Sequence, residues 1–400
     1  MRIAIFHNRY LQRGGEDTAV DGEAELLEKG GHRVERCLVE NRDALARPLS
    51  ALRTALRARR NPHSASLVAT LLRAGPVDVA HVHNFFPVLS PSLHEALSSR
   101  GVPVVQTLHN YRLLCANGNL LREGRACEEC LTRGPWHAVR YGCYRGSRLQ
   151  TAVWAEVVAH HRARGTWLRC VDRFAALSEF ARRKFIAAGL PGERIEVANQ
   201  SLEDPGEPAP PGEGAIYVGR LSREKGVDLL IDAWREAIGT PLAIAGTGAE
   251  EGALRERARG VPRVRFLGAL SHDAVLRELR AAAFAVVPSR CYENAPFAAV
   301  EALASARPVV AWRGGSLADV IEEGRSGLLF DALDPRSISA TCRRLANDRQ
   351  LVQRLGAGAR ERYLERHAPD VVLAQRERLY AAVIEERRRG GSRGAVPAPA

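Results

Sequence analysis

The feature that most constrains the fold of this 400-residue chain is a repeated alternation of short apolar runs with amphipathic helical segments. Short apolar runs bounded by turn residues indicate buried strands, and their alternation with helices indicates parallel α/β folding. We therefore expect two doubly wound, Rossmann-like domains that face one another across a cleft. The expected strands are 3–6, 34–39, 77–83, 102–108, 174–177 and 195–197, and then 215–218, 241–245, 264–267, 284–288, 308–312 and 327–330.

The stretch Glu203–Gly214 divides the chain, because it holds four prolines and three glycines and cannot be a helix or a central strand. This predicts a first domain over 1–202, a linker over 203–214 and a second domain over 215–370. A helix is expected over 371–388, and it could pack back on the first domain. Residues 389–400 are expected to be a disordered tail. Ligands of open α/β sheets bind at the carboxyl ends of the strands, so we expect the function there.

The charge favours anionic partners, since 58 Lys and Arg outnumber 46 Asp and Glu for a net charge of +12. Nucleotides, phosphorylated substrates and anionic lipid surfaces fit this balance. Nucleic-acid binding would rest on net charge alone, because no platform of alternating basic and aromatic residues is present. Two groups of arginines allow either a solvated face or contact with an anionic membrane: Arg53, Arg57, Arg59 and Arg60, then Arg133, Arg140, Arg145 and Arg148.

The start of the chain, from Met1 to Phe6, indicates a strand rather than a signal peptide, and no apolar run reaches about 18 residues. We therefore expect a cytoplasmic protein, with the inner membrane face as the alternative location. Four of the eight cysteines lie in one polar stretch, as Cys115, Cys127, Cys130 and Cys143. They could hold a structural zinc ion, or they could be four unrelated thiols.

Three short motifs follow expected strands. Gly14 and Gly15 would let the backbone approach a bound group, although a structural turn explains them equally well, and the absence of GxGxxG disfavours a nicotinamide dinucleotide. Arg220 and Lys225 flank a loop where two cations could hold a diphosphate, the alternative being surface charge near a helix start. His109 ends an expected strand and could face the cleft.

A fourth region is the pair Glu293 and Glu301. Glu293 follows an expected strand, and Glu301 lies in an apolar helical run, where an unpaired carboxylate would be costly to bury. Sugar and ribose hydroxyls are suitable partners for both carboxylates. The alternative is that Glu301 faces solvent.

Taken together, these residues resemble the family-4 retaining glycosyltransferases of the GT-B fold. The likeness covers the chain from Arg2 to about Arg388. It rests on Gly219-Arg220-Leu221 with Glu224-Lys225-Gly226, on the Glu293/Glu301 pair and on the later glycine motifs of the second half. The cysteine-containing stretch resembles an insertion of a bacterial subset. Ala198–Ser201 departs from the family's usual Pro-Asn-Gly run, and Glu293-Asn-Ala-Pro-Phe departs from its commoner Gly-Phe-Gly form.

The resemblance implies transfer of a hexose-type sugar from a nucleotide diphosphate sugar to an acceptor, with retention and without a catalytic metal. It implies that Arg220 and Lys225 bind the diphosphate, Glu293 the transferred sugar and Glu301 the ribose, and that His109 lies near the sugar. The remaining implied substrate-binding residues are Gly14, Gly15, Gly219, Gly246, Gly248, Asn294, Ala295, Pro296 and Phe297. The expected acceptor is a sugar or a lipid-linked sugar of a cell-surface polysaccharide or glycolipid.

Two other classes of function remain open from the sequence. One is different chemistry on the same fold, such as a nucleotide-sugar epimerase or a phosphorylase; a phosphorylase is disfavoured because the chain has only three lysines. The other is a non-catalytic protein that binds a sugar nucleotide.

Overall fold

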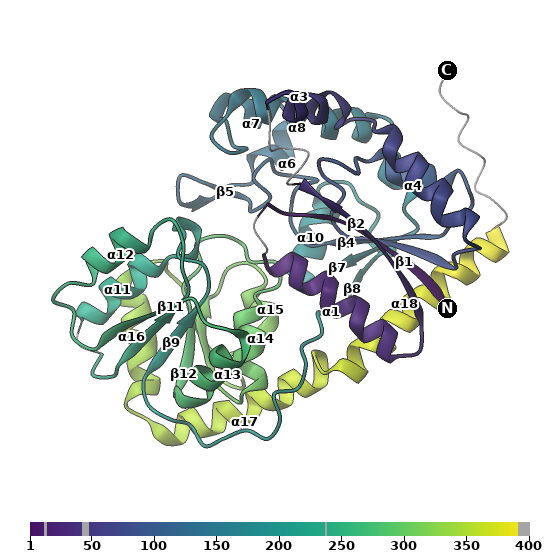
Figure 1. Cartoon of the computed structure of the whole chain (residues 1–400). Helices are drawn as coiled ribbons and strands as arrows, with labels where there is room; N and C mark the ends of the chain where they lie inside the picture. The colour runs from purple at the N-terminus through teal and green to yellow at the C-terminus, as the bar shows by residue number, and fades with distance from the viewer. Residues whose placement is uncertain (12–13, 42–47, 237, 391–400) are drawn as a thin grey trace. The chain divides into compact units, whose positions relative to one another are not determined.

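The computed structural model describes residues 1–11, 14–41, 48–236 and 238–390, and its two main sheets are both parallel (Figure 1). The chain divides into two compact units. Unit 1 comprises residues 1–119, 128–201 and 372–400, and unit 2 comprises 120–127 and 202–371. The chain thus passes between units at 201/202 and 371/372, and the short segment 120–127 belongs with unit 2 although its neighbours on both sides belong to unit 1.

Unit 1 is built on a sheet of order β2-β1-β3-β4-β7-β8. Its strands are β1 (Arg2–Arg9), β2 (Arg33–Glu40), β3 (Val79–Val82), β4 (Val104–Leu108), β7 (Arg173–Ala176) and β8 (Ile195–Val197). Its helices are α1 (Gly15–Lys29), α3 (Pro48–Arg57), α4 (Pro62–Arg73), α5 (Ser92–Ser98), α6 (Glu129–Arg133), α7 (His137–Tyr141), α8 (Arg148–Ala163), α9 (Thr166–Cys170) and α10 (Glu179–Ala187). Most of α18 (Pro369–Gly390) completes the unit.

Unit 2 has the sheet order β11-β10-β9-β12-β13-β14. Its strands are β9 (Ala215–Val218), β10 (Leu242–Ala245), β11 (Val264–Gly268), β12 (Phe284–Val287), β13 (Val309–Trp312) and β14 (Gly327–Phe330). Its helices are α11 (Val227–Arg235), α12 (Glu251–Arg257), α13 (His272–Ala281), α14 (Phe297–Ala304), α15 (Leu317–Val320), α16 (Pro335–Ala346) and α17 (Arg349–Arg366). A short hairpin of β5 (Leu121–Arg122) and β6 (Arg125–Ala126) is assigned to this unit as well.

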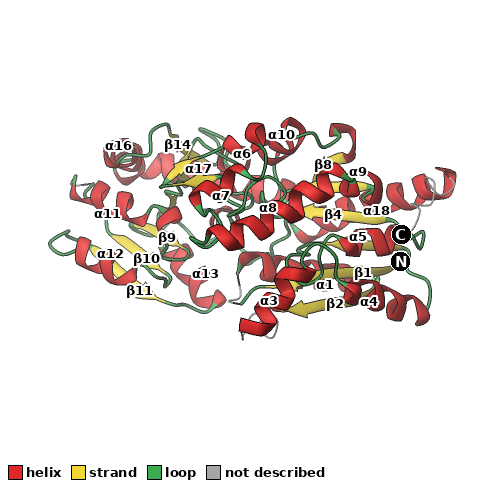
Figure 2. Ribbon diagram, turned by 90° about the horizontal axis from the view of Figure 1, so that it is seen from above, coloured by secondary structure: helices red, strands yellow, loops and turns green. Residues whose placement is uncertain are grey.

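Helices flank the strands of both sheets (Figure 2). In unit 2, side chains of α11 and α16 form one apolar core against the sheet, and side chains of α13, α14 and α17 form a second core. In unit 1, β1 and β3 pack against α1 and α18 through residues such as Ile3, Leu27 and Tyr380. Both sheets are therefore covered layers, which explains why strands such as β10 and β12 are apolar and buried throughout. The edge strand β2 differs, since it has no fully buried residue and carries four charged side chains.

The α/β fold and all twelve strands expected from the sequence are confirmed, with ends shifted by a few residues. The hairpin β5–β6 and the helices α6 to α9 between Glu129 and Cys170 were not predicted. The expected tail is wrong at its start, since α18 continues through Gly390; residues 391–400 lie outside the described part of the chain. Among the described residues, no helix combines the length and the apolar character needed to cross a membrane.

Candidate functional site

The strand order of unit 2 reverses between β9 and β12, which are the first and fourth strands of the sheet but lie side by side. At such a point the loops leaving the two carboxyl ends diverge to opposite faces and open a crevice, where ligands of doubly wound sheets bind. The two loops here are 219–226, after β9, and 288–296, after β12. They carry the predicted cations and one of the predicted carboxylates.

Lys225 and Glu293, which are 68 residues apart in the sequence, meet at this point. The ammonium Nζ of Lys225 lies 2.5 Å from Oε1 of Glu293, and the hydroxyl of Ser289 donates to the same oxygen at 2.5 Å. Burial alone would raise the pKa of Glu293, but the Lys225 charge and the Ser289 hydroxyl hold it below its ordinary value. Burial likewise opposes the charge of Lys225, but Glu293 keeps the pKa of Lys225 above its ordinary value. Both side chains are therefore charged at neutral pH.

Arg220 stands at the exposed edge of the same loop. Its side chain is 70% exposed and contacts Glu224 at 3.3 Å. Its backbone is held more firmly, because the hydroxyl of Tyr217 donates to the Arg220 carbonyl at 2.8 Å. Exposed ion pairs contribute little stability, typically about 0.2–1 kcal/mol. The Arg220 guanidinium can therefore turn toward an anionic ligand at small cost while its backbone stays in place.

The glycines at 246 and 248 allow the loop after β10 to lie against the loop after β9. A Cβ atom at Gly246 would come within 1.9 Å of the Gly219 carbonyl oxygen, and one at Gly248 within 2.3 Å of the Leu221 carbonyl oxygen. Backbone hydrogen bonds join the two loops, including one of 2.9 Å from Leu221 N–H to the Thr247 carbonyl. These contacts give the predicted glycines a packing role, and their contact with a substrate remains a prediction.

The loop after β12 leads into α14, and Ser316 fixes it from the neighbouring loop. The backbone N–H of Ser316 donates to the Glu293 carbonyl at 3.3 Å, and its hydroxyl donates to the same oxygen. The predicted residues Asn294, Ala295 and Pro296 lie in this loop, and Phe297 begins α14. The backbone of Glu293 is thus held by two hydrogen bonds from Ser316.

Glu301 does not face solvent, because its side chain is only 13% exposed. It projects from α14 toward His272, the first residue of α13, with 3.4 Å between Oε1 of Glu301 and Nδ1 of His272. The hydrogen bond to Glu301 raises the pKa of His272, whose own side chain is half exposed. Sequence reasoning did not single out His272, although it follows the capping residue Ser271 at a helix start.

In unit 1, His109 follows β4 and forms a hydrogen bond with His83, which follows β3. Nδ1 of His83 lies 2.7 Å from Nε2 of His109. Burial lowers the pKa of His109 to about 4 and that of His83 well below its ordinary value. Both rings are therefore neutral at pH 7, and one of the two facing nitrogens donates its proton to the other. The strand order of this sheet reverses between β1 and β3, so His83 lies at the ligand-binding point of its own sheet.

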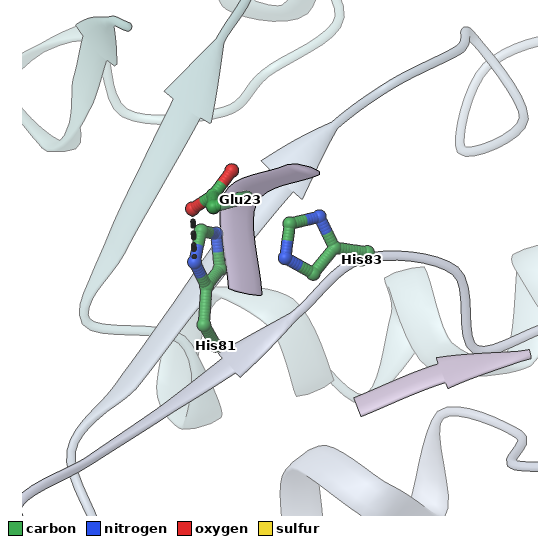
Figure 3. A group of neighbouring side chains, drawn as sticks. All are labelled: Glu23, His81 and His83. Carbon is green, nitrogen blue, oxygen red and sulfur yellow. Dashed lines mark ion pairs between the residues drawn. The ribbon is translucent and has the colours of Figure 1, made fainter. Parts of the chain in front are cut away.

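Glu23, His81 and His83 form the one group of three or more metal-ligating side chains found within 4.8 Å of one another in the described residues (Figure 3). Glu23 and His81 face one another, with 3.0 Å between Oε1 and Nδ1. Arg376 of α18 also donates to Glu23, at 2.9 Å. Burial would raise the pKa of Glu23, but Arg376 and His81 hold it well below its ordinary value. A divalent cation would add buried charge to a carboxylate that Arg376 already neutralises, so the group is better explained as a hydrogen-bonding network.

Gly14 precedes α1, and its backbone N–H donates to Oδ2 of Asp17 at 3.0 Å. A Cβ at Gly14 would meet nothing within 4 Å, so packing does not require glycine there and the space beside it is open. Gly15 is the first residue of α1. The structure therefore places both predicted glycines at a helix start with room beside Gly14, and leaves their contact with a ligand as a prediction.

The four cysteines, for which the sequence allows either a zinc site or four unrelated thiols, are all free of disulfide bonds. Cys115 and Cys130 are buried, and Sγ of Cys115 donates to Asn117 at 3.1 Å. Cys127 belongs to unit 2, whereas Cys115, Cys130 and Cys143 belong to unit 1. The group of Glu23, His81 and His83, which is the one cluster of metal-ligating side chains found in the described ranges, includes no cysteine. A structural zinc ion thus remains a prediction from the sequence.

Comparison with known proteins matches both halves of the chain to glycosyltransferase families. Residues 14–199 match the family described as glycosyl transferase 4-like domain, and residues 212–348 match glycosyl transferases group 1. The glycogen synthase of Mycobacterium tuberculosis is 36% identical over 154 residues, which span 37% of this chain and 37% of that protein. The match therefore spans under two fifths of the length of this relative.

Solved structures share the fold over nearly the whole chain. The sucrose-phosphate synthase of Thermosynechococcus elongatus is 18% identical with a TM-score of 0.71, covering 96% of this chain and 99% of that one. HepE of Anabaena, solved with UDP and glucose, is 17% identical with a TM-score of 0.66, covering 95% and 99%. The chain therefore has the GT-B fold.

Proposed function

We propose that this chain, both halves of which match glycosyltransferase families, transfers a hexose-type sugar from a nucleotide diphosphate sugar to an acceptor. The observation that carries the proposal is the partly buried pair Lys225–Glu293 at the strand reversal of unit 2, with Arg220 on the same loop as Lys225. This arrangement offers cations for a diphosphate and a carboxylate for sugar hydroxyls. HepE, which has the same fold, was solved with UDP-glucose, which supports a donor of this class.

In the proposed reaction, Lys225 and Arg220 bind the two phosphates and stabilise the negative charge that develops as the nucleotide leaves. Glu293 accepts hydrogen bonds from hydroxyls of the transferred sugar, and Glu301 accepts them from the ribose. The bond from C1 of the sugar to the phosphate oxygen breaks, and an acceptor oxygen bonds to C1. We propose retention of configuration, with the acceptor proton passing to the leaving phosphate on the same face and no metal ion taking part.

The Lys225–Glu293 contact has a consequence for donor binding. In the absence of donor each charge neutralises the other. When a diphosphate draws Lys225 away from Glu293, sugar hydroxyls must take the place of Lys225 as hydrogen-bond donors to the Glu293 carboxylate. A nucleotide without its sugar supplies the phosphates but not these hydroxyls. We therefore expect the complete nucleotide sugar to bind more tightly than the nucleoside diphosphate alone.

The first experiment is thermal unfolding against a panel of nucleoside diphosphates and their sugars, because a ligand of the folded state must raise the midpoint temperature of unfolding.

Lys225→Ala and Glu293→Gln should then each lower turnover by at least about a hundredfold, the scale of removing one transition-state contact. Lys184→Ala is the matched control, because Lys184 forms a similar pair with Glu128, at 2.6 Å, in unit 1. Turnover unchanged in Lys225→Ala, or equally reduced in Lys184→Ala, would contradict the site. Release of an epimerised donor would favour the epimerase alternative.

We also propose that unit 1 meets an anionic membrane surface through α3, where the acceptor would be lipid-linked. The helix exposes Leu49 and Leu56 at 76% each and Leu52 at 57%, while Arg53 and Arg57 supply positive charge on the same helix. An exposed apolar stripe with basic neighbours is typical of helices that lie at a membrane interface. Sedimentation with phosphatidylglycerol vesicles should recover the protein, and Leu49→Ser with Leu56→Ser should reduce the recovery. Equal recovery of the double variant would refute this role of α3.

A further inference from the structure

Arg112 lies at the ligand-binding edge of the sheet in unit 1, four residues after the end of β4, and aromatic rings surround its guanidinium group. The guanidinium carbon is 5.8 Å from the ring centre of Tyr10, 5.9 Å from that of Tyr144 and 6.0 Å from that of Phe86. Three rings at these distances stabilise a cation through their π faces.

The guanidinium of Arg112 makes no hydrogen bond or ion pair within the part of the chain that the structure describes, and its Nε atom is buried without a partner. Other enclosed arginines differ: Arg307 donates to backbone carbonyls, and Arg376 donates to Glu23. A guanidinium carries five donors, and here the Nε–H is enclosed without a partner, which is costly away from water. Arg112 thus has the donors of a binding site and no protein group that uses them.

The nearby carboxylate of Glu16 is already engaged. The hydroxyl of Tyr10 donates to Oε2 of Glu16 at 2.7 Å, and the side-chain amide of Asn110 donates to the same oxygen at 3.1 Å. Burial would lower the pKa of Arg112, but the oxygens of Tyr10, Tyr144 and Glu16 raise it overall, so the group stays charged. The surroundings therefore keep the charge without pairing it.

The backbone on either side of this side chain is fixed. The N–H of Arg112 donates to Oδ1 of Asn110 at 2.9 Å, and the indole N–H of Trp154 donates to the Arg112 carbonyl at 2.9 Å. Trp154 is fully buried in α8. A cation held in one position by its backbone binds a ligand without first having to be ordered.

We propose that Arg112 binds an anionic oxygen group, a phosphate or a carboxylate, carried by the acceptor. This rests on the proposed function, which places the diphosphate of the donor on loops 219–226 and 288–296 of unit 2 and leaves unit 1 for the acceptor. The planar fork of a guanidinium matches two oxygens of a phosphate or a carboxylate at once, which a lysine cannot do. His109, three residues before Arg112, would then lie beside the same substrate.

Hydrogen exchange of the full-length protein tests the proposal, with inorganic phosphate, acetate and chloride at equal ionic strength as probes. Phosphate or acetate at ten times its Kd should slow exchange about tenfold in peptides covering 109–115, whereas chloride should not. An effect of phosphate alone indicates a phosphate-bearing acceptor such as a lipid phosphate, and an effect of acetate alone indicates an acidic sugar. Equal exchange in all three salts would overturn the proposal.

Two variants show whether Arg112 itself is responsible. Arg112→Gln should abolish the slowing, and Arg112→Lys should retain only part of it because the charge remains without the fork. Slowing that persists in Arg112→Gln would also overturn the proposal; should that variant fail to fold, full slowing in Arg112→Lys would do the same. The loop 219–226 is followed in the same samples with nucleotides. A failure there counts against the donor site and leaves the result at Arg112 intact.

Discussion

Acidification should unfold unit 1 before unit 2, because unit 1 buries histidines in their neutral form. His94 is fully buried, and Nε2 of its ring lies 2.8 Å from the side-chain oxygen of Gln106. His161 is 2% exposed, and its Nε2 lies 2.8 Å from the Arg59 carbonyl. Burial lowers the pKa of each ring to about 4. In the unfolded chain the same rings have a pKa of about 6.5.

The sign of the effect follows from proton binding. Between pH 6.5 and pH 4 the histidine rings bind protons in the unfolded chain but stay neutral in the folded protein. The free energy of unfolding therefore decreases as the pH falls through this window. With native and unfolded pKa values of about 4 and 6.5, each ring costs about 2 kcal/mol between pH 7 and pH 5, or about 4 kcal/mol for His94 and His161 together. His109, whose pKa is also lowered to about 4, acts in the same direction.

Unit 2 provides the contrast. Its His272 has a raised pKa because of the hydrogen bond to Glu301, so any contribution it makes is present at low pH and is lost as the pH rises. Urea unfolding at pH 7 and pH 5 would be followed through Trp154 for unit 1 and Trp234 for unit 2, each as the single tryptophan with the others replaced by Phe. Both indoles are buried, so each reports the opening of its own unit.

The midpoint seen by Trp154 should fall by more than about 1 M urea between pH 7 and pH 5, since 1 M corresponds to about 1–3 kcal/mol. The midpoint seen by Trp234 should fall much less. His94→Gln should remove about 2 kcal/mol of the pH-dependent loss in unit 1. The reasoning is refuted if both reporters shift equally, or if His94→Gln leaves the pH dependence of unit 1 unchanged.

Arg376→Met should destabilise unit 1 by about 3–5 kcal/mol by leaving the buried charge of Glu23 without its guanidinium, and the double variant with Glu23→Gln should recover part of that loss in urea unfolding. Gly226→Ala should lower turnover at least about tenfold with the fold retained, because φ is +69° and the added Cβ would come within 2.2 Å of the Pro288 carbonyl oxygen. Gly252→Ala, where a Cβ meets nothing within 4 Å, is the matched control, and equal turnover in the two variants would refute this.

Most strands were predictable because they are buried and therefore appear as short apolar runs, as β10 and β12 do. The same rule failed between Glu129 and Cys170, where four helices, three of them of only five residues, follow one another without intervening strands. It also failed for the hairpin β5–β6, whose strands have two residues each, too few for any periodic pattern. Segments that owe their shape to what they pack against leave little trace in the order of apolar and polar residues.

The candidate site was predictable to the level of loops but not of contacts. That Arg220, Lys225 and Glu293 each follow a strand could be seen in the sequence, and parallel strands place such loops at one edge. That Lys225 and Glu293 touch depends on β9 lying beside β12, which no local pattern encodes. Arg112 escaped notice for a different reason. Its significance is the lack of a partner, and this becomes visible only when every neighbour is in place.

The network around Glu23 extends this argument to the organisation of the whole chain. Glu23 and Arg376 are 353 residues apart in the sequence, yet Tyr380 of the same helix α18 also reaches His81 at 2.7 Å. His81 packs in turn on His83, with ring centres 4.2 Å apart, beneath the bond to His109. The last helix therefore supports the edge of unit 1 that carries the proposed acceptor residues. Separating the chain at its proline-rich linker would take the guanidinium of Arg376 away from Glu23 and α18 away from the core of unit 1. The two units therefore cannot be separated as two consecutive halves of the sequence.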